Sequence, residues 1–384
     1  MSEDKKTKKV LYVATVVKTH IMEFHIPYLK MLKDMGWETA VAARNDYENP
    51  DDCKIPYCDT YFDIPFERNP FKPGNIKAYK SLKRIINEGH YDIIHCHTPV
   101  GGMLTRLAAK KARKNGSRIF YTAHGFHFYK GAPMLNWVLY YPVEKWLSKK
   151  TDDLLTINSE DYGRAKRFHA KHNEYIPGVG IDIHRYRLTS GTGTNNDALN
   201  RRDLLREELR IPPDAKVMLS VGEVNRNKNH RIVIETLPEL DNCWFILCGK
   251  GPLMEEHQKL AEKLGVSERF KMLGYRTDLV DFYHMADVFV FPSIREGLGL
   301  ALMEAMASDC TCVASRNRGT NDLLIDSELR FDSNNKQELV EKIKKALYEN
   351  QSEEINRNRT VLEKYDLSNA LQIMKSFYLR EVGE

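Results

Sequence analysis

The chain has 384 residues, of which 42% are hydrophobic and 29% are charged, so it is long enough to form two domains with separate cores. No apolar run reaches the roughly 18 residues that a membrane-spanning helix requires. Residues 1–9 are polar and lack the apolar core of a signal peptide. These features exclude a membrane-spanning protein and predict a chain that stays in the cytoplasm.

Seven cysteines are scattered along the chain without a CxxC pair, which predicts reduced thiols and excludes a disulfide or zinc framework. The net charge of +5 is uneven, with +9 over 1–185 and −4 over 186–384. Residues 101–150 carry ten basic residues against the single acid Glu144. The first half is therefore expected to meet an anionic partner, while the acidic second half argues against nucleic acid.

Strand-like and helix-like runs alternate through the first half. β-branched and aromatic runs predict strands, and runs with helical apolar spacing predict helices between them. The expected strands cover 9–17, 37–43, 91–97, 118–123 and 153–158, with helices at 23–35, 76–87 and 102–115 and a loop at 15–22. This alternation predicts a doubly wound parallel sheet, which binds ligands at the carboxyl ends of its strands.

Histidines stand at two of these strand ends. His97 and His124 each close a predicted strand, and His127 follows. A lone histidine in such a place is more often structural than functional. These three residues are nevertheless the candidates for function in the first half. We expect His95 and His97 to point to opposite faces of their strand and therefore not to bind a metal ion as a pair.

Residues 134–150 mix Trp, Tyr, Leu and Met with lysines, and they follow a basic helix. Aromatic residues flanked by cations fit the interface of an anionic membrane. A core helix whose lysines reach out to solvent is the alternative. The sequence leaves both interpretations open.

The second half repeats the plan. Strands are expected at 215–221, 243–248, 270–273, 286–291 and 311–315, each followed by a glycine-bearing turn. Such turns converge at one edge of a parallel sheet, as a nucleotide site requires. Residues 189–197 are rich in Thr, Gly and Asn and predict a flexible linker, so the hinge between the domains is expected near 180–200.

The turn after the strand at 286–291 carries the strongest signal. It reads Glu296-Gly-Leu-Gly-Leu-Ala-Leu-Met-Glu304, with glycines that break the strand and helix formers from Leu300 onward. The start of this helix offers free N–H groups and a positive dipole end to a phosphate. Glu304 stands among apolar residues, where a carboxylate needs donors such as ligand hydroxyls; an exposed position or an arginine partner is the alternative.

Two glutamates separated by seven residues, in this strand–glycine–helix context, resemble the signature of family-4 retaining glycosyltransferases. The resemblance implies the α/β GT-B architecture, in which two Rossmann-like domains face each other across a cleft. It implies an acceptor-binding domain over 1–185, a nucleotide-sugar-binding domain over 186–365, and a terminal helix over 366–384 that crosses back to the first domain.

The resemblance also implies roles for single residues. Glu296 would hold hydroxyls of the donor sugar and Glu304 those of the ribose. The backbone of Leu298, Gly299 and Leu300 would meet the diphosphate.

Lys228 would also contact the diphosphate, and His124, in its Thr-x-His-Gly context, would contact the donor sugar. Glu223 stands where the family usually has an arginine, so Arg226 is the substitute candidate for that charge. The remaining candidate contacts to the donor are Gly222, Gly251 and Arg276.

The implied reaction moves a hexose or N-acetylhexosamine from a nucleoside diphosphate sugar to an acceptor hydroxyl with retention, and UDP is expected from its frequency in the family. No Asp-x-Asp pair occurs, so no metal and no further cofactor are expected. The motifs His-Cys-His-Thr-Pro and His-Gly-Phe-His resemble bacterial capsule and exopolysaccharide enzymes. That resemblance implies an undecaprenyl-diphosphate-linked saccharide as acceptor and peripheral contact with the inner face of the cytoplasmic membrane through 101–150. The alternatives are a sugar-nucleotide epimerase of the same shape and a basic lipid-binding adaptor without enzymatic activity.

Overall fold

The computed structural model describes residues 7–187 and 195–382, without the side chains of 195–200 and 381–382. The chain forms two compact units, one of Met1–Gly180 with Ser368–Glu384 and one of Ile181–Leu367. The divisions thus fall after 180 and 367, whereas the sequence placed them after 185 and 365. Most of the linker predicted at 189–197 lies outside the described residues.

The first unit contains a seven-stranded parallel sheet in the order β3-β2-β1-β4-β5-β6-β7. Its strands are β1 (Lys9–Val16), β2 (Glu38–Arg44), β3 (Thr60–Asp63), β4 (Ile93–His97), β5 (Arg118–Ala123), β6 (Asp153–Thr156) and β7 (His172–Tyr175). The central strands are buried along their length, because helices cover both faces of the sheet. The strand order reverses between β1 and β4, which is where a doubly wound sheet binds ligands.

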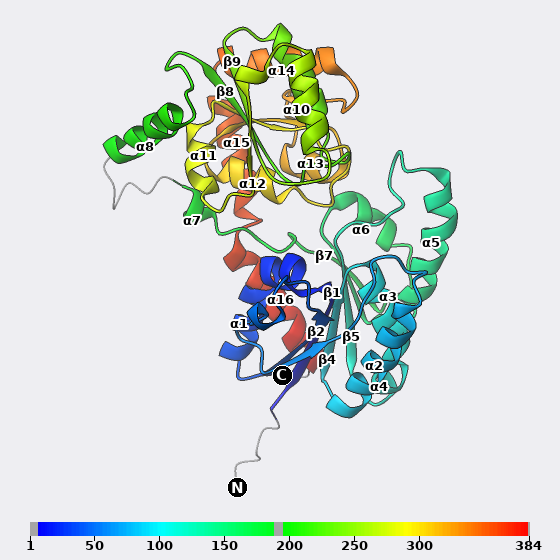
Figure 1. The fold of residues 1–384 in the computed structure, drawn as a ribbon. Coiled ribbons are helices and arrows are strands. Elements are labelled where there is room, and N and C mark those ends of the chain that lie inside the picture. Colours follow the sequence, from blue (N-terminus) through cyan, green and yellow to red (C-terminus); the bar gives the residue numbers. More distant parts are fainter. Residues whose placement is uncertain (1–6, 188–194, 383–384) are drawn as a thin grey trace. The chain divides into compact units, whose positions relative to one another are not determined.

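Helices α1 (Ile26–Asp34) and α16 (Leu367–Val382) lie on one face of this sheet in Figure 1, and α2, α3 and α4 lie on the other. The remaining bounds are α2 (Gly74–Gly89), α3 (Pro99–Ala108), α4 (Lys110–Lys114), α5 (Met134–Ser148), α6 (Ser159–Ala165) and the short turn η2 (Pro50–Asp52). The loop predicted at 15–22 is wrong. A π-helical turn η1 (Val17–Met22) follows β1 directly, since this stretch contains neither glycine nor proline to break a helix.

The second unit contains a six-stranded parallel sheet in the order β10-β9-β8-β11-β12-β13. Its strands are β8 (Lys216–Val221), β9 (Cys243–Cys248), β10 (Phe270–Gly274), β11 (Val288–Phe291), β12 (Thr311–Ser315) and β13 (Arg330–Phe331). Here the order reverses between β8 and β11. The glycine-bearing turns at 222 and 297–299 therefore follow neighbouring strands.

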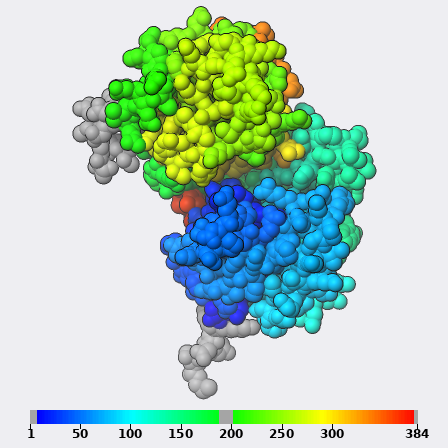
Figure 2. Space-filling model, in the orientation of Figure 1, coloured from blue at the N-terminus to red at the C-terminus, as the bar shows by residue number. Residues whose placement is uncertain are grey.

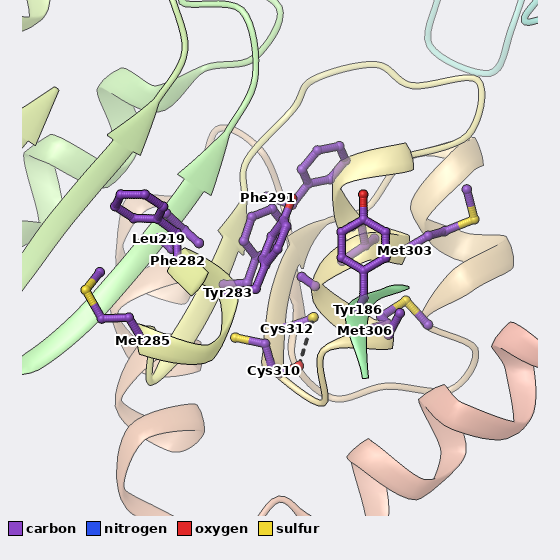
Figure 3. Close-up of a cluster of buried hydrophobic side chains, with 14 of the residues drawn as sticks. Tyr186, Leu219, Phe282, Tyr283, Met285, Phe291, Met303, Met306, Cys310 and Cys312 are labelled. Carbon is purple, nitrogen blue, oxygen red and sulfur yellow. Dashed lines mark hydrogen bonds between the residues drawn. The ribbon is translucent and has the colours of Figure 1, made fainter. Parts of the chain in front are cut away.

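Separate apolar clusters cover the two faces of this second sheet. Helices α9 (His230–Thr236), α10 (Met254–Lys263) and α14 (Lys336–Tyr348) pack on one face. The other face is covered by α8 (Asn195–Glu208), α11 (Leu279–Met285), α12 (Leu300–Ala307) and α15 (Ser352–Glu363). The sequence did not predict α8. Figure 3 shows this second cluster, to which Tyr283, Phe291 and Met306 belong. The other short elements are α7 (Ile183–Tyr186), α13 (Arg318–Leu323), η3 (Leu237–Glu239) and η4 (Ser267–Arg269).

Candidate active site

The turn between β11 and α12 brings two of the predicted residues into contact. Lys228 Nζ donates to Glu296 Oε1 at 2.8 Å, and both side chains are largely shielded from solvent. Lys228 comes from the turn after β8 and Glu296 from the turn after β11, the two strands at which the sheet order reverses. The sequence predicted both residues, but it did not predict that they form an ion pair.

Hydrogen bonds to backbone carbonyls fix this pair in place. Asn227 Nδ2 donates to the carbonyl of Arg295 at 2.9 Å, and the Ile294 N–H donates to the carbonyl of Asn227 at 2.8 Å. Arg318, which is buried, donates from Nε to the carbonyl of Glu296 at 3.1 Å. Arg318 was missed as a site residue, although its Arg-Asn-Arg-Gly turn at 316–319 was visible in the sequence.

Glycines at the carboxyl ends of the strands allow the turns there to pack closely. A Cβ on Gly249 would lie 1.8 Å from the carbonyl oxygen of Gly222, and one on Gly251 would lie 2.4 Å from that of Val224. A Cβ on Gly299 would lie 2.9 Å from the ring of Phe291. These glycines therefore let the backbone of the turns and of the α12 start stay close together at the sheet edge.

Glu304 lies one turn into α12 and is held by two tyrosines. Its Oε1 accepts from Tyr186 Oη at 2.8 Å and its Oε2 from Tyr283 Oη at 2.7 Å. Burial, followed by the nearby Glu304 charge, raises the pKa of both phenols, so they stay protonated as donors. The carboxylate is half-buried, so the exposed position considered from the sequence does not describe it. The two tyrosines carried no signal in the sequence.

The remaining predicted donor residues differ in their surroundings. Arg226 is exposed in the turn after β8. Arg276 donates from Nε to Asp278 Oδ1 at 2.8 Å and lies over the Phe282 ring. Leu298 and Leu300 are half-buried and pack against the core beneath the helix start.

In the first unit, four histidines gather where the sheet order reverses. His20 comes from η1, His25 precedes α1, His97 ends β4 and His124 follows β5. His20 and His25 approach at 3.3 Å between their Nε2 atoms, and His97 Nδ1 lies 3.3 Å from His124 Nε2. The sequence named His97 and His124 but gave no indication that the other two join them.

The expectation that His95 and His97 face opposite ways is wrong. Residues two apart on a strand share a face, and these ring centroids are 4.2 Å apart. His95 is nevertheless distinct, because its Nδ1 contacts Tyr378 Oη at 2.6 Å and its Nε2 contacts Thr122 Oγ1 at 2.8 Å. Burial lowers the pKa of His95 to about 3 and that of His124 to about 4, so both rings are neutral at neutral pH.

A cavity of about 430 Å³ opens beside the histidines. Its wall includes Thr98, whose φ of +63° and ψ of 152° place a residue other than glycine in a strained backbone region. The sequence gave no signal for this residue. Glu144, the single acid of the basic segment, also lines the cavity and pairs with the buried Arg106 at 2.9 Å. The cavity is mostly apolar, and α5 forms one of its walls.

The outer side of α5 (teal in Figure 2) is apolar and exposed. Exposed fractions of 43–77% are found for Met134, Leu135, Val138, Leu139, Val143 and Trp146. The opposite side of the helix packs on the core through Trp137, Tyr140, Tyr141 and Leu147. The core-helix interpretation is therefore only half right. Among the described residues, none of the helices has the length and apolarity to cross a bilayer.

A basic surface lies next to this apolar side. A hollow on the first unit is lined by Lys110, Lys114, Lys149 and Lys150, among other residues. Lys150 lies over the ring of Trp146 at 4.8 Å, and Lys145 over that of Tyr141 at 5.9 Å. Aromatic rings and ammonium groups are thus combined along one edge of α5.

Comparison with known proteins gives consistent matches over both units. The family model "Glycosyl transferase 4-like" matches residues 9–158, and "Glycosyl transferases group 1" matches residues 201–361. The chain is 43% identical over 331 residues to "Putative glycosyltransferase EpsD" of Bacillus subtilis (strain 168), covering 85% of this chain and 83% of that protein.

A more distant relative is the "UDP-Gal:alpha-D-GlcNAc-diphosphoundecaprenol alpha-1,3-galactosyltransferase" of Escherichia coli. It is 27% identical over 260 residues, or 65% of this chain and 64% of the relative. Among solved structures, Anabaena Alr3699/HepE in complex with UDP and glucose matches with a TM-score of 0.78 at 17% identity, covering 97% of this chain and 100% of that one. This structural likeness shows the fold, which is the GT-B arrangement of two Rossmann-like domains.

Proposed function

The chain belongs to the family-4 GT-B glycosyltransferases. We propose that it transfers a hexose or N-acetylhexosamine from a UDP-sugar to an undecaprenyl-diphosphate-linked saccharide. The ion pair between Lys228 and Glu296 is the observation that carries this proposal. It sets a cation and a carboxylate side by side at a sheet reversal, next to the free N–H groups of a helix start. A diphosphate joined to a polyhydroxyl sugar needs both kinds of partner.

In this proposal the second unit binds the donor. Lys228, Arg226 and the α12 start at Gly299 and Leu300 stabilise the diphosphate as it leaves, without a divalent metal ion on it. Glu296 then accepts from sugar hydroxyls, while Glu304, oriented by its two tyrosines, accepts from the ribose. Gly222, Gly251 and Arg276 border the space for the rest of the nucleotide.

The reaction breaks the bond between the anomeric carbon and the diphosphate oxygen. The acceptor oxygen bonds to the same face of that carbon, so the configuration is retained, and its proton passes to the departing diphosphate. No protein nucleophile is required, and the two glutamates hold ligand rather than flank the bond as in glycoside hydrolases. His124 supplies the ring that contacts the sugar.

The first unit binds the acceptor in this proposal. Its cavity is large enough for a saccharide, and its wall shares Val143 with the exposed apolar side of α5. A lipid-linked saccharide combines both chemistries, a polar sugar and an apolar chain. The relative from E. coli carries such an acceptor in its name, and the EpsD relative is named a glycosyltransferase. A place in exopolysaccharide or capsule synthesis is part of this proposal.

We further propose that α5 places the enzyme on the inner face of the cytoplasmic membrane. Its apolar side would enter the boundary between headgroups and acyl chains, while Lys110, Lys114, Lys149 and Lys150 would meet anionic headgroups. Each such lysine contributes about 1 kcal/mol near an anionic surface, so the four together favour binding substantially at low salt.

The test is sugar transfer by the full-length chain, with UDP-sugars as donors and an undecaprenyl-diphosphate-linked saccharide as acceptor. We expect Glu296→Ala to abolish transfer, while Glu255→Ala, which breaks an exposed ion pair of the same unit, leaves it unchanged. Near-normal turnover in Glu296→Ala would refute the assigned role. A free altered sugar nucleotide formed without acceptor would instead indicate an epimerase.

A further inference from the structure

The four histidines at the β1–β4 reversal lie close enough together to bind one metal ion. One ring nitrogen from each of His20, His25, His97 and His124 lies within 4.8 Å of the corresponding nitrogen of the other three. Three of the rings are buried and the fourth is half-buried. We propose that this cluster binds one divalent transition-metal ion, and that zinc suits it best.

The spacing of the nitrogens fits such an ion. Zinc bonded to four nitrogens at 2.0–2.1 Å in a tetrahedron separates them by about 3.3–3.4 Å. The Nε2 atoms of His20 and His25 lie 3.3 Å apart, which is this separation. By contrast, the fully hydrogen-bonded His95 makes contacts of 2.6 and 2.8 Å. A tightening of the wider nitrogen separations would complete the tetrahedron.

A small cavity and two unsatisfied groups lie beside the cluster. The cavity has a volume of about 20 Å³ and is lined by His25, His97 and His124 together with Tyr28. This volume holds one atom of the size of a water molecule or a metal ion. The buried His97 Nε2 and Tyr28 Oη have no hydrogen-bond partner among the described residues. Buried polar atoms are rarely left without a partner, so something is expected to occupy this place.

The local fold explains how two of the rings meet. In a regular α-helix, residues five apart point about 140° away from each other, because each residue turns by roughly 100°. The π-helical turn η1 closes its hydrogen bonds five residues apart, and it carries His20 toward His25. Single π turns are rare and commonly mark functional sites.

The chemistry of the cluster selects the kind of metal. Imidazole nitrogens suit zinc, copper, iron or nickel, whereas magnesium and calcium prefer oxygen ligands. No carboxylate belongs to the cluster, so the site differs from the metal-assisted diphosphate sites that the sequence argued against.

The experiment uses the full-length protein after chelator treatment and gel filtration. We expect zinc, titrated in competition with a chromophoric chelator, to bind at one ion per chain, and Co²⁺ to give the intense visible absorption of a tetrahedral site. His25→Asn and His97→Asn should weaken zinc binding at least tenfold. His95→Gln, which alters an equally buried ring outside the cluster, should still bind one ion.

Absence of saturable binding, or equal binding by wild type and His25→Asn, would overturn the proposal and leave a bound water as the occupant. If the asparagine variants fail to fold, the Co²⁺ spectrum of the wild type decides, since weak octahedral absorption would also overturn it. These measurements use neither donor nor acceptor, so they stand apart from the proposed transfer. One consequence does rest on that transfer: His124 cannot serve metal and sugar together, so zinc should inhibit the wild type more than His25→Asn.

Discussion

Replacing Lys228 by alanine should separate catalysis from stability. If Lys228 leaves Glu296 to meet a diphosphate oxygen, a unit charge about 4 Å away in a site of effective dielectric about 20 contributes about 4 kcal/mol. That corresponds to about a thousandfold in rate, and removal of one pre-organised charge stabiliser typically costs about 10²–10³ in kcat. We therefore expect kcat to fall by about 10²–10³.

The same substitution should cost little in folding free energy. The exposed fractions of the two side chains are 22% and 14%, so the pair lies between a surface and a buried ion pair. Its loss should lower the free energy of unfolding by about 1–2 kcal/mol. The assay is steady-state transfer at saturating donor, with chemical denaturation in parallel. Lys259→Ala, which breaks the exposed pair with Glu255, serves as the control and should change neither quantity.

The outcomes distinguish a catalytic pair from a structural one. If the pair has only a structural role, the loss in Lys228→Ala comes from the unpaired, partly buried Glu296 carboxylate. The Lys228→Ala/Glu296→Ala double variant should then recover both the stability and the transfer lost in Lys228→Ala. If each residue binds its own part of the donor, the double variant should be at least as inactive as either single variant. Transfer by Lys228→Ala within tenfold of the wild type would refute the reasoning.

Three further predictions concern other parts of the chain. Tyr283→Phe removes a donor to the Glu304 carboxylate, so the binding free energy of UDP, measured by calorimetry, should weaken by about 1.5–3 kcal/mol. An unchanged affinity would refute the proposed contact between Glu304 and the ribose. Burial lowers the pKa of His230 from 6.5 to about 3, so its neutral form stabilises the fold above pH 6.5 and this contribution is lost as pH falls. Between pH 6 and 4, His230→Leu should therefore flatten the decline in unfolding free energy by about 1.4 kcal/mol per pH unit, and an unaltered slope would contradict this. Leu135→Asp with Leu139→Asp should abolish sedimentation with anionic vesicles, whereas Ile76→Asp, an equally exposed apolar position on α2, should not; equal binding by all variants would exclude α5 as the membrane contact.

The sequence predicted the parallel sheets because their strands are buried on both faces. Such strands read as continuous apolar runs, as in Val10–Ala14 and Val288–Phe291, and glycines mark where several of them end. The turns that carry Lys228 and Glu296 follow the neighbouring strands β8 and β11, but the ion pair between these residues was not predicted. The strands of both sheets could therefore be predicted, because local sequence determines where they begin and end.

Features that depend on distant contacts could not be predicted. Tyr186 reaches Glu304 across 118 positions of the chain, and nothing near either residue indicates that contact. His20 joins His97 only because a π turn replaces the expected loop, and a single extra residue in a helical turn leaves no mark in hydrophobic periodicity. The apolar residues of α5 read equally well as core or as surface, because composition does not say which side of a helix is covered.

Both groups of candidate residues lie where the order of strands reverses, and chain connectivity explains why. At such a point the connections from two neighbouring strands leave in opposite directions, so no helix closes over the strand ends and their side chains remain available to ligands. In the second unit this leaves Lys228 and Glu296 with only each other as partners of opposite charge among the contacts described. In the first unit it leaves Thr98 in a strained backbone, where its hydroxyl meets that of Thr15 at 2.6 Å across the reversal. Strain of about 1–3 kcal/mol persists only where surrounding structure enforces it. The strained Thr98 therefore marks the β1–β4 crevice as a place shaped for binding, independently of the family to which the chain belongs.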